Sequence, residues 1–250
     1  MNYTKKDEQY EKIFQQAKND SEVLGFALVG GRGKGFATEN SDYDIYIITS
    51  ENYLDEAKKK YPSTIKPFKF DIFVHSMSSF KEYANFGTSH EWDRYNFAYI
   101  KAIFDNTDGE FQKIIDEKGK IPEDRVREIT KDNLDSYINC FYRSVKNHRD
   151  GNAFAVYLDS TESVQWLVAF VFSIEGRVKP FSKYIEWALK EHPLEFLPWS
   201  GEEFMLVMKK LLQTDNMEFQ KEVFQKICKF AIERGYKEII DSWDGCYFGE

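Results

Sequence analysis

Apolar positions in the first half of the chain follow two different spacings. Between residues 5 and 19 they recur at helical spacing among charged residues, which predicts an amphipathic helix. An apolar run at 23–29 predicts a buried strand, a second strand is expected at 43–49, and an alternating segment predicts a third at 67–74. A helix is expected over 52–61 because Pro62 follows it, and 98–105 fits a short strand or a helical turn.

The second half, from about residue 122, has long helical patterns with few glycines. Helices are expected at 123–149, 152–175, 179–191, 201–213 and 217–234. We therefore predict an α/β domain over 1–118, followed by an all-helical bundle domain over 119–250. The apolar run at 166–172 is far shorter than the roughly 20 residues of a membrane-spanning helix, so a buried helix is expected there and no membrane partner.

The composition narrows the class of protein. The chain has 250 residues, of which 42% are hydrophobic, enough for a sizeable core. Its net charge of -8 argues against broad electrostatic binding of nucleic acid or anionic membranes. The three cysteines are far apart and form no metal-binding or disulfide pattern, which indicates free thiols in a cytoplasmic protein. The polar N-terminus lacks the apolar core of a signal peptide.

Two acidic residues, Asp42 and Asp44, follow a glycine-rich turn and carry the clearest chemical signal. Side chains at i and i+2 of a strand point to the same face, so both carboxylates are expected to face one way. Like charges this close need a compensating cation, and hard oxygen ligands suit Mg²⁺. Asp71 on the third expected strand can join them, which predicts a site for one or two Mg²⁺ ions beside a substrate phosphate.

The glycine turn at 30–35 supplies flexible backbone N–H groups, and Arg32 and Lys34 add two cations where a phosphate chain could lie. The turn lacks the spacing of a Walker A loop and of a Rossmann fingerprint. A flexible hairpin loop is the alternative interpretation.

Residues 26–74 resemble the nucleotidyltransferase superfamily that includes DNA polymerase beta and the aminoglycoside nucleotidyltransferases. The superfamily signature is a Gly-Ser or Gly-Gly turn, a variable spacer, an Asp-x-Asp or Asp-x-Glu pair, and a third carboxylate on a later strand. In this chain the turn is Gly30-Gly31, the spacer is residues 32–41, the pair is Asp42 and Asp44, and the third carboxylate is Asp71. Gly31 stands where many members have serine, so the missing hydroxyl must be replaced by backbone N–H groups, Ser41, Arg32 or Lys34.

The resemblance implies a polymerase-beta-like domain with a mixed sheet and an enzyme that moves a nucleoside monophosphate, most simply AMP from ATP, to a hydroxyl of a small molecule. Asp42 and Asp44 would bind two Mg²⁺ ions, and Asp71 would bind one ion or deprotonate the acceptor. The triphosphate cradle would consist of Gly30, Gly31, Arg32, Lys34 and Ser41. The helical half resembles the antibiotic-modifying branch, which, with the acidic net charge, favours an aminoglycoside acceptor.

The helical half holds further candidates. In similar enzymes a helical domain closes over the nucleotide, and Lys146 and Lys183 are the candidates for contacting its phosphates, with ordinary surface charge as the alternative. Glu162 is a candidate base or acceptor contact, with an exposed helix carboxylate as the alternative. Arg143 and His148 match the Arg-x₄-His pattern of HEPN-type ribonucleases, a pattern short enough to arise by chance.

Two rival functions stay open at this point. One is a nucleotidyltransferase-like antitoxin or protein-modifying module of a toxin–antitoxin system, against which the full helical half argues, because such antitoxins are usually single small domains. The other is a nucleic-acid polymerising enzyme, against which the negative charge and the lack of a basic stripe argue.

Overall fold

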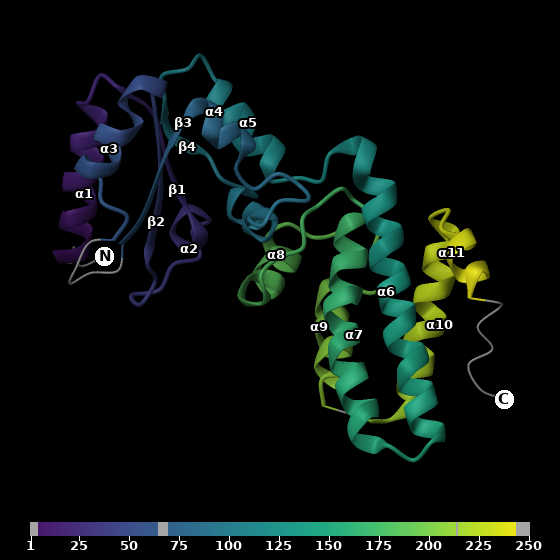
Figure 1. Ribbon diagram of the computed structural model, residues 1–250. Helices are drawn as coiled ribbons and strands as arrows, with labels where there is room; N and C mark the ends of the chain where they lie inside the picture. Colours follow the sequence, from purple (N-terminus) through teal and green to yellow (C-terminus); the bar gives the residue numbers. More distant parts are fainter. Residues whose placement is uncertain (1–4, 65–69, 214, 244–250) are drawn as a thin grey trace. The chain divides into compact units, whose positions relative to one another are not determined.

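The computed structural model describes residues 5–64, 70–213 and 215–243. The strands within these residues form one mixed sheet (Figure 1). Its order is β3-β2-β1-β4. β1 runs antiparallel to both its neighbours, and β2 and β3 run parallel. The bounds are Val23–Val29 for β1, Tyr43–Thr49 for β2, Phe70–Ser76 for β3 and Ala102–Asp105 for β4. The α/β fold with a mixed sheet is therefore confirmed.

Helices cover both faces of this sheet. On one face, α1 (Lys5–Lys18) and α3 (Leu54–Lys60) pack Ile13, Ala17 and Ala57 against the strands. On the other face, the packing elements are α4 (Met77–Glu82), η2 (Glu91–Phe97) and α5 (Glu110–Lys118). Two short elements, α2 (Gly30–Gly33) and η1 (Glu51–Tyr53), follow β1 and β2 directly. The alternation of side chains along each strand thus separates two apolar cores.

The chain divides into two compact units, Met1–Lys120 and Ile121–Glu250. The second unit is helical, with α6 (Glu123–Arg149), α7 (Ala153–Ser173), η3 (Ser182–Tyr184), α8 (Ile185–Glu191), α9 (Gly201–Leu211), α10 (Met217–Glu233) and α11 (Lys237–Ser242). The long helices α6 and α7 are antiparallel, because Asn147 bonds to Asp159 at 2.7 Å near one end and Asn133 to Ser173 at 3.3 Å near the other. That each unit folds as a separate domain stays a prediction.

The sequence expectations hold best for the long or strongly apolar elements. β1, β2 and α6 have the expected bounds. The third strand was expected at 67–74. Its described part, β3, continues to Ser76, two residues beyond the expected end, and residues 67–69 lie outside the described chain. The helices α4, α5 and α11 were not expected, since each is short and its apolar residues show no long repeat.

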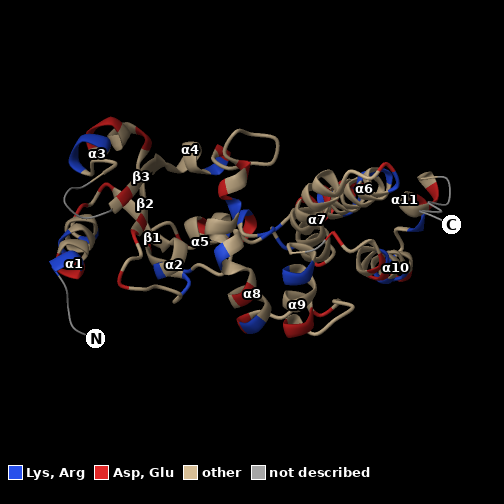
Figure 2. Ribbon diagram, turned by 90° about the horizontal axis from the view of Figure 1, so that it is seen from below, with Lys and Arg blue, Asp and Glu red and all other residues tan. Residues whose placement is uncertain are grey.

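Charged residues of both signs are distributed along the helices of both units (Figure 2). None of the described helices combines the length and the apolar character needed to cross a membrane.

A half-buried imidazole lies on the α4 side of the sheet. The ring of His75 in β3 lies 4.9 Å from the ring of Tyr83 and 5.9 Å from those of Tyr46 and Phe80. Burial lowers the pKa of His75 to about 4, and the positive charges of Lys58 and Lys118 act in the same direction. The folded protein therefore holds a neutral imidazole, whereas the unfolded chain protonates it below its ordinary pKa of about 6.5.

This imbalance predicts acid lability. As the pH falls from about 6.5 toward 4, the unfolded state takes up a proton that the folded state refuses, and about 3 kcal/mol of stability is lost. Urea unfolding of the wild type and of His75→Phe at pH 7.5 and pH 4.5 checks this, and the variant should show the smaller loss. The control is His148→Gln, which removes an exposed imidazole of α6. Equal losses in wild type and His75→Phe would contradict the assignment.

Candidate active site

Three neighbouring strands bring two of the predicted carboxylates into one row. In the sheet register, Asp44 of β2 pairs with Val29 of β1 on one side and with Asp71 of β3 on the other. The next pair on this face, Tyr46 and Phe73, confirms the alignment because their rings stack at 4.9 Å. Asp44 and Asp71 therefore occupy adjacent positions on one face of the sheet.

Asp42 lies directly before the first residue of β2 and is half-buried. Its Oδ1 atom is buried and lacks a hydrogen-bond partner in the described part of the chain. A buried carboxylate oxygen without a donor is costly, and a divalent cation is the partner that such an oxygen suits. The donor set of Asp42, Asp44 and Asp71 fits Mg²⁺ chemically. Within residues 5–64, 70–213 and 215–243, however, no three acidic, histidine or cysteine side chains are arranged to hold a metal ion.

The carboxylate of Asp44 lies against the backbone of Gly30. Gly30 has a φ of +63°, and a Cβ added to it would lie 2.2 Å from Asp44 Oδ2. Glycine is needed here for two reasons, since the left-handed backbone disfavours a side chain and the space is taken by a carboxylate. Gly30 and Gly31 are buried and open a single helical turn, α2. This turn lies in the connection between the antiparallel strands β1 and β2, so the hairpin considered from the sequence is present and begins with a helical turn.

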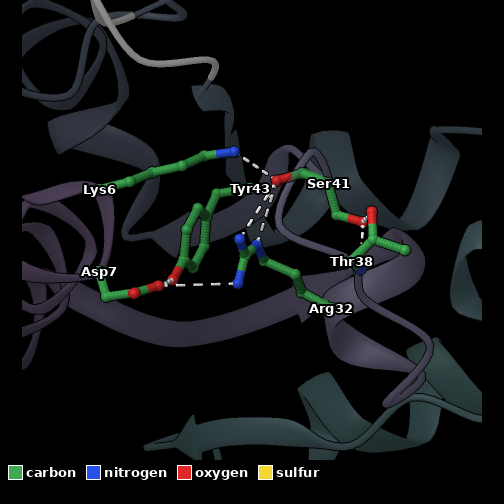
Figure 3. A network of polar contacts seen from close by, with 6 residues as sticks. All are labelled: Lys6, Asp7, Arg32, Thr38, Ser41 and Tyr43. Atoms are coloured by element: carbon green, nitrogen blue, oxygen red, sulfur yellow. Dashed lines mark hydrogen bonds and ion pairs between the residues drawn. The ribbon is translucent and has the colours of Figure 1, made fainter. Parts of the chain in front are cut away.

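The segment between α2 and β2 is held by a polar network (Figure 3). Arg32 donates from Nε and from one terminal nitrogen to the carbonyl of Ser41, each at 3.3 Å, and its guanidinium lies 3.9 Å from the centre of the Tyr43 ring. Lys6 of α1 donates to the same carbonyl. Asp7 of α1 accepts a hydrogen bond from the Tyr43 hydroxyl at 2.5 Å and forms an ion pair with Arg32 at 3.7 Å.

Comparison with known proteins identifies the family. A family model described as a nucleotidyltransferase domain matches residues 8–146, more than half of the chain. The chain belongs to this nucleotidyltransferase family. No curated protein matches it. A crystal structure of a nucleotidyltransferase-like protein from Exiguobacterium sibiricum is 11% identical to this nucleotidyltransferase, with 98% of this chain and 81% of that chain covered and a TM-score of 0.45. A likeness of that size carries no argument about activity or substrate.

The two cations of the predicted triphosphate cradle already have partners in this nucleotidyltransferase. Lys34 is buried, and its Nζ donates to the carbonyls of Asn96, at 3.1 Å, and of Ala98. Arg32 is bound to the Ser41 carbonyl and to Asp7, as described above. The Lys34 ammonium carries three N–H donors and the Arg32 guanidinium five, so these contacts do not use up either cation, and phosphate contact by either stays a prediction. The Ser41 hydroxyl accepts a hydrogen bond at 2.9 Å from the N–H of Thr38, and its predicted role in phosphate binding stays a prediction.

The candidates in the helical unit are exposed. Lys146 lies in the last turn of α6, with its Nζ 5.2 Å from the ring centre of Tyr142. Lys183 lies in η3, with its Nζ 4.7 Å from the ring centre of Tyr184. Neither lysine is buried, so each is free to reach solvent, and phosphate contact by either stays a prediction.

Glu162 is an exposed residue of α7 that forms an ion pair with Arg143 of α6. Arg143 also pairs with Asp159 at 3.0 Å, so it bridges two carboxylates of the neighbouring helix. Ion pairing between α6 and α7 therefore accounts for Arg143 and Glu162 without a catalytic role. Of the two residues that match the HEPN-type pattern, Arg143 is engaged in these ion pairs and His148 lies exposed near the end of α6.

Sequence reasoning did not single out Lys6, Asp7 or Tyr43. No local pattern marks them, because Lys6 and Asp7 resemble the ordinary charged residues of an amphipathic helix. Tyr43 resembles an ordinary core residue of a strand. Only the packing of α1 onto the start of β2 brings the three together (Figure 3).

Proposed function

We propose that this nucleotidyltransferase is a Mg²⁺-dependent enzyme that transfers a nucleoside monophosphate, with AMP from ATP as the first choice, to a hydroxyl of a small molecule. The observation that carries the proposal is the row formed by Asp44 and Asp71, with Gly30 beside it. The unpartnered buried oxygen of Asp42 supports the same assignment, because it lacks the donor or cation that it needs.

In the proposed reaction, the acceptor oxygen bonds to the α-phosphorus while the bond to the bridging oxygen breaks and pyrophosphate leaves. Asp42 and Asp44 would hold Mg²⁺ through carboxylate oxygens, and Asp71 would take the acceptor proton or complete the ligand set. When bound, Mg²⁺ would offset phosphate charge and favour ionisation of the attacking hydroxyl. The backbone of Gly30 and Gly31 would allow the triphosphate to approach closely, because no side chain intervenes.

A groove beside β3 bears on the choice of acceptor. It has a volume of about 490 Å³ and is lined in β3 by the residues from Ile72 to His75, which follow Asp71 in the strand. Asp71 itself is not among the described residues that line it. The exposed ring of Phe73 lies in its wall, and the described residues that line it include one permanent charge, Lys58. A polycationic aminoglycoside suits the net charge of the whole chain but not this lysine. We therefore propose the groove for acceptors with little positive charge, and keep aminoglycosides as the competing prediction.

The test is an acceptor panel. The protein is incubated with Mg²⁺ and each of the four nucleoside triphosphates labelled at the α-phosphate, together with aminoglycosides, lincosamides, sugars, nucleic acid or protein. We expect label on a small molecule, an equal amount of released pyrophosphate, and no transfer in EDTA.

The matched control for the panel is Asp71→Asn, which should lose transfer and keep the fold. Label found on protein alone would favour the antitoxin-like or protein-modifying alternative. Label on nucleic acid alone would favour a polymerising enzyme. Transfer to aminoglycosides in preference to uncharged acceptors would overturn the assignment of the groove.

A further inference from the structure

We infer that helix α1 positions the carboxylates of the active site through Lys6, Asp7 and Arg32, and that Arg32 is a positioning residue rather than a phosphate ligand. The inference rests on the proposed function, since it concerns the carboxylates that would hold Mg²⁺. It assigns a role in the reaction to α1, an element that carries none of the residues of the family signature.

Tyr43 is the first point of attachment. It separates Asp42 from Asp44 in the sequence, and its side chain points to the α1 face of the sheet while that of Asp44 points to the other. Its ring stacks on Tyr10 at 4.6 Å and on Phe70 at 4.9 Å. Its hydroxyl donates a hydrogen bond to Asp7 of α1. Holding Tyr43 in place fixes the backbone from which both neighbouring carboxylates project.

The carbonyl of Ser41 is the second point of attachment. It belongs to the peptide group that leads into Asp42, and it accepts hydrogen bonds from two cations, Lys6 and Arg32 (Figure 3). Because a peptide group is planar, a fixed carbonyl direction also fixes the N–H of Asp42 and limits the directions its side chain can take. Such charge-assisted hydrogen bonds are stronger than neutral ones.

Asp7 joins the two points of attachment. It accepts from the hydroxyl of Tyr43 and pairs with the guanidinium of Arg32, which itself lies over the Tyr43 ring. Removing Asp7 therefore loosens Arg32 and Tyr43 together, without touching any residue of the carboxylate row. This makes Asp7 the residue at which a positioning role can be tested.

A second acidic residue provides a matched control. Asp20 also accepts hydrogen bonds from tyrosines, Tyr53 and Tyr61, each at 3.1 Å, and forms an ion pair with Lys60 at 2.6 Å. These partners lie in η1, α3 and the residue that follows α3, and the N–H of Glu22 also donates to Asp20, at 3.2 Å. None of these groups adjoins Asp42 or Asp44 in the sequence. Asp20→Ala thus removes an equivalent set of interactions that does not lead to the carboxylates.

The experiment measures Mn²⁺ binding by electron paramagnetic resonance in the presence of ATP, and the KM for Mg²⁺ and for ATP in the transfer assay. Asp7→Ala should weaken Mn²⁺ binding and raise the KM for Mg²⁺ by about 10-fold or more, the usual effect of losing a group that orients a metal ligand. Asp20→Ala should destabilise the protein and leave both values as in the wild type. Asp7→Asn keeps an acceptor for Tyr43 and should recover part of the loss.

Arg32→Met distinguishes the two roles of the arginine. A positioning role predicts the metal defect of Asp7→Ala with an unchanged KM for ATP, whereas a phosphate ligand predicts a raised KM for ATP with Mn²⁺ binding retained. The second result, or equal Mn²⁺ binding by Asp7→Ala and Asp20→Ala, would overturn the inference. A wild-type protein that binds no Mn²⁺ with ATP would instead refute the proposed function on which the inference rests.

Discussion

Asp44→Asn is expected to lower nucleotidyl transfer by roughly 10³-fold or more. Charge stabilisation by a catalytic metal ion is worth several kcal/mol, and about 1.4 kcal/mol corresponds to a factor of ten in rate. Asparagine has the shape of aspartate but lacks the charge that holds the cation. The measurement is the initial rate of transfer with saturating ATP and acceptor, over a range of Mg²⁺ concentrations that would reveal a simple loss of metal affinity.

The fold of this variant should survive. Asp44 lies beside Asp71 in the sheet, so the removal of one like charge should leave the Tm unchanged or slightly higher in metal-free buffer. Asp55→Asn, at an exposed position of α3, removes the same charge at a residue outside the carboxylate row and should keep full activity. Turnover retained by Asp44→Asn would rule out metal binding by this carboxylate.

Gly30→Ala is expected to damage both stability and activity. The left-handed backbone of Gly30 costs a residue with a side chain roughly 1–2 kcal/mol, and the new Cβ would lie 2.2 Å from Asp44 Oδ2. The carboxylate must therefore move. Because a displacement of about 1 Å in an active site can lower a rate by about 10²-fold, we expect a loss of that size in transfer.

Gly35→Ala separates the two effects of the Gly30 substitution. Gly35 has a similar φ of +70°, but a Cβ added there would meet no atom within 4 Å. It should lose stability to backbone strain and keep its activity, with stability measured by urea unfolding and activity by the transfer assay. If Gly35→Ala lost as much transfer as Gly30→Ala, the contact between Gly30 and Asp44 would not be the cause.

The parts of this protein that were predictable from sequence are those set by local periodicity. The apolar runs of β1 and β2 and the long amphipathic pattern of α6 have the bounds that their sequences indicate. Asp42, Asp44 and the glycines at 30 and 31 were also recognisable as candidates, because their spacing along one short segment carries the signal. The spacing of apolar residues within one segment predicts the type and length of the element and which of its side chains share a face, so these features can be predicted without knowledge of the fold.

Tertiary structure alone decided which distant groups meet. The pairing of Asp71 with Asp44 depends on the register between two strands separated by a long connection, which no local pattern specifies. Arg32 and Lys34 have long side chains that can reach several acceptors, and packing directs them to backbone carbonyls of residues 41, 96 and 98. The partnership of Asp7 with Tyr43 exists only because α1 packs on the face of the sheet to which Tyr43 points. The sequence by itself determined the elements and the candidate chemistry, and the packing of those elements determined which side chains act on one another.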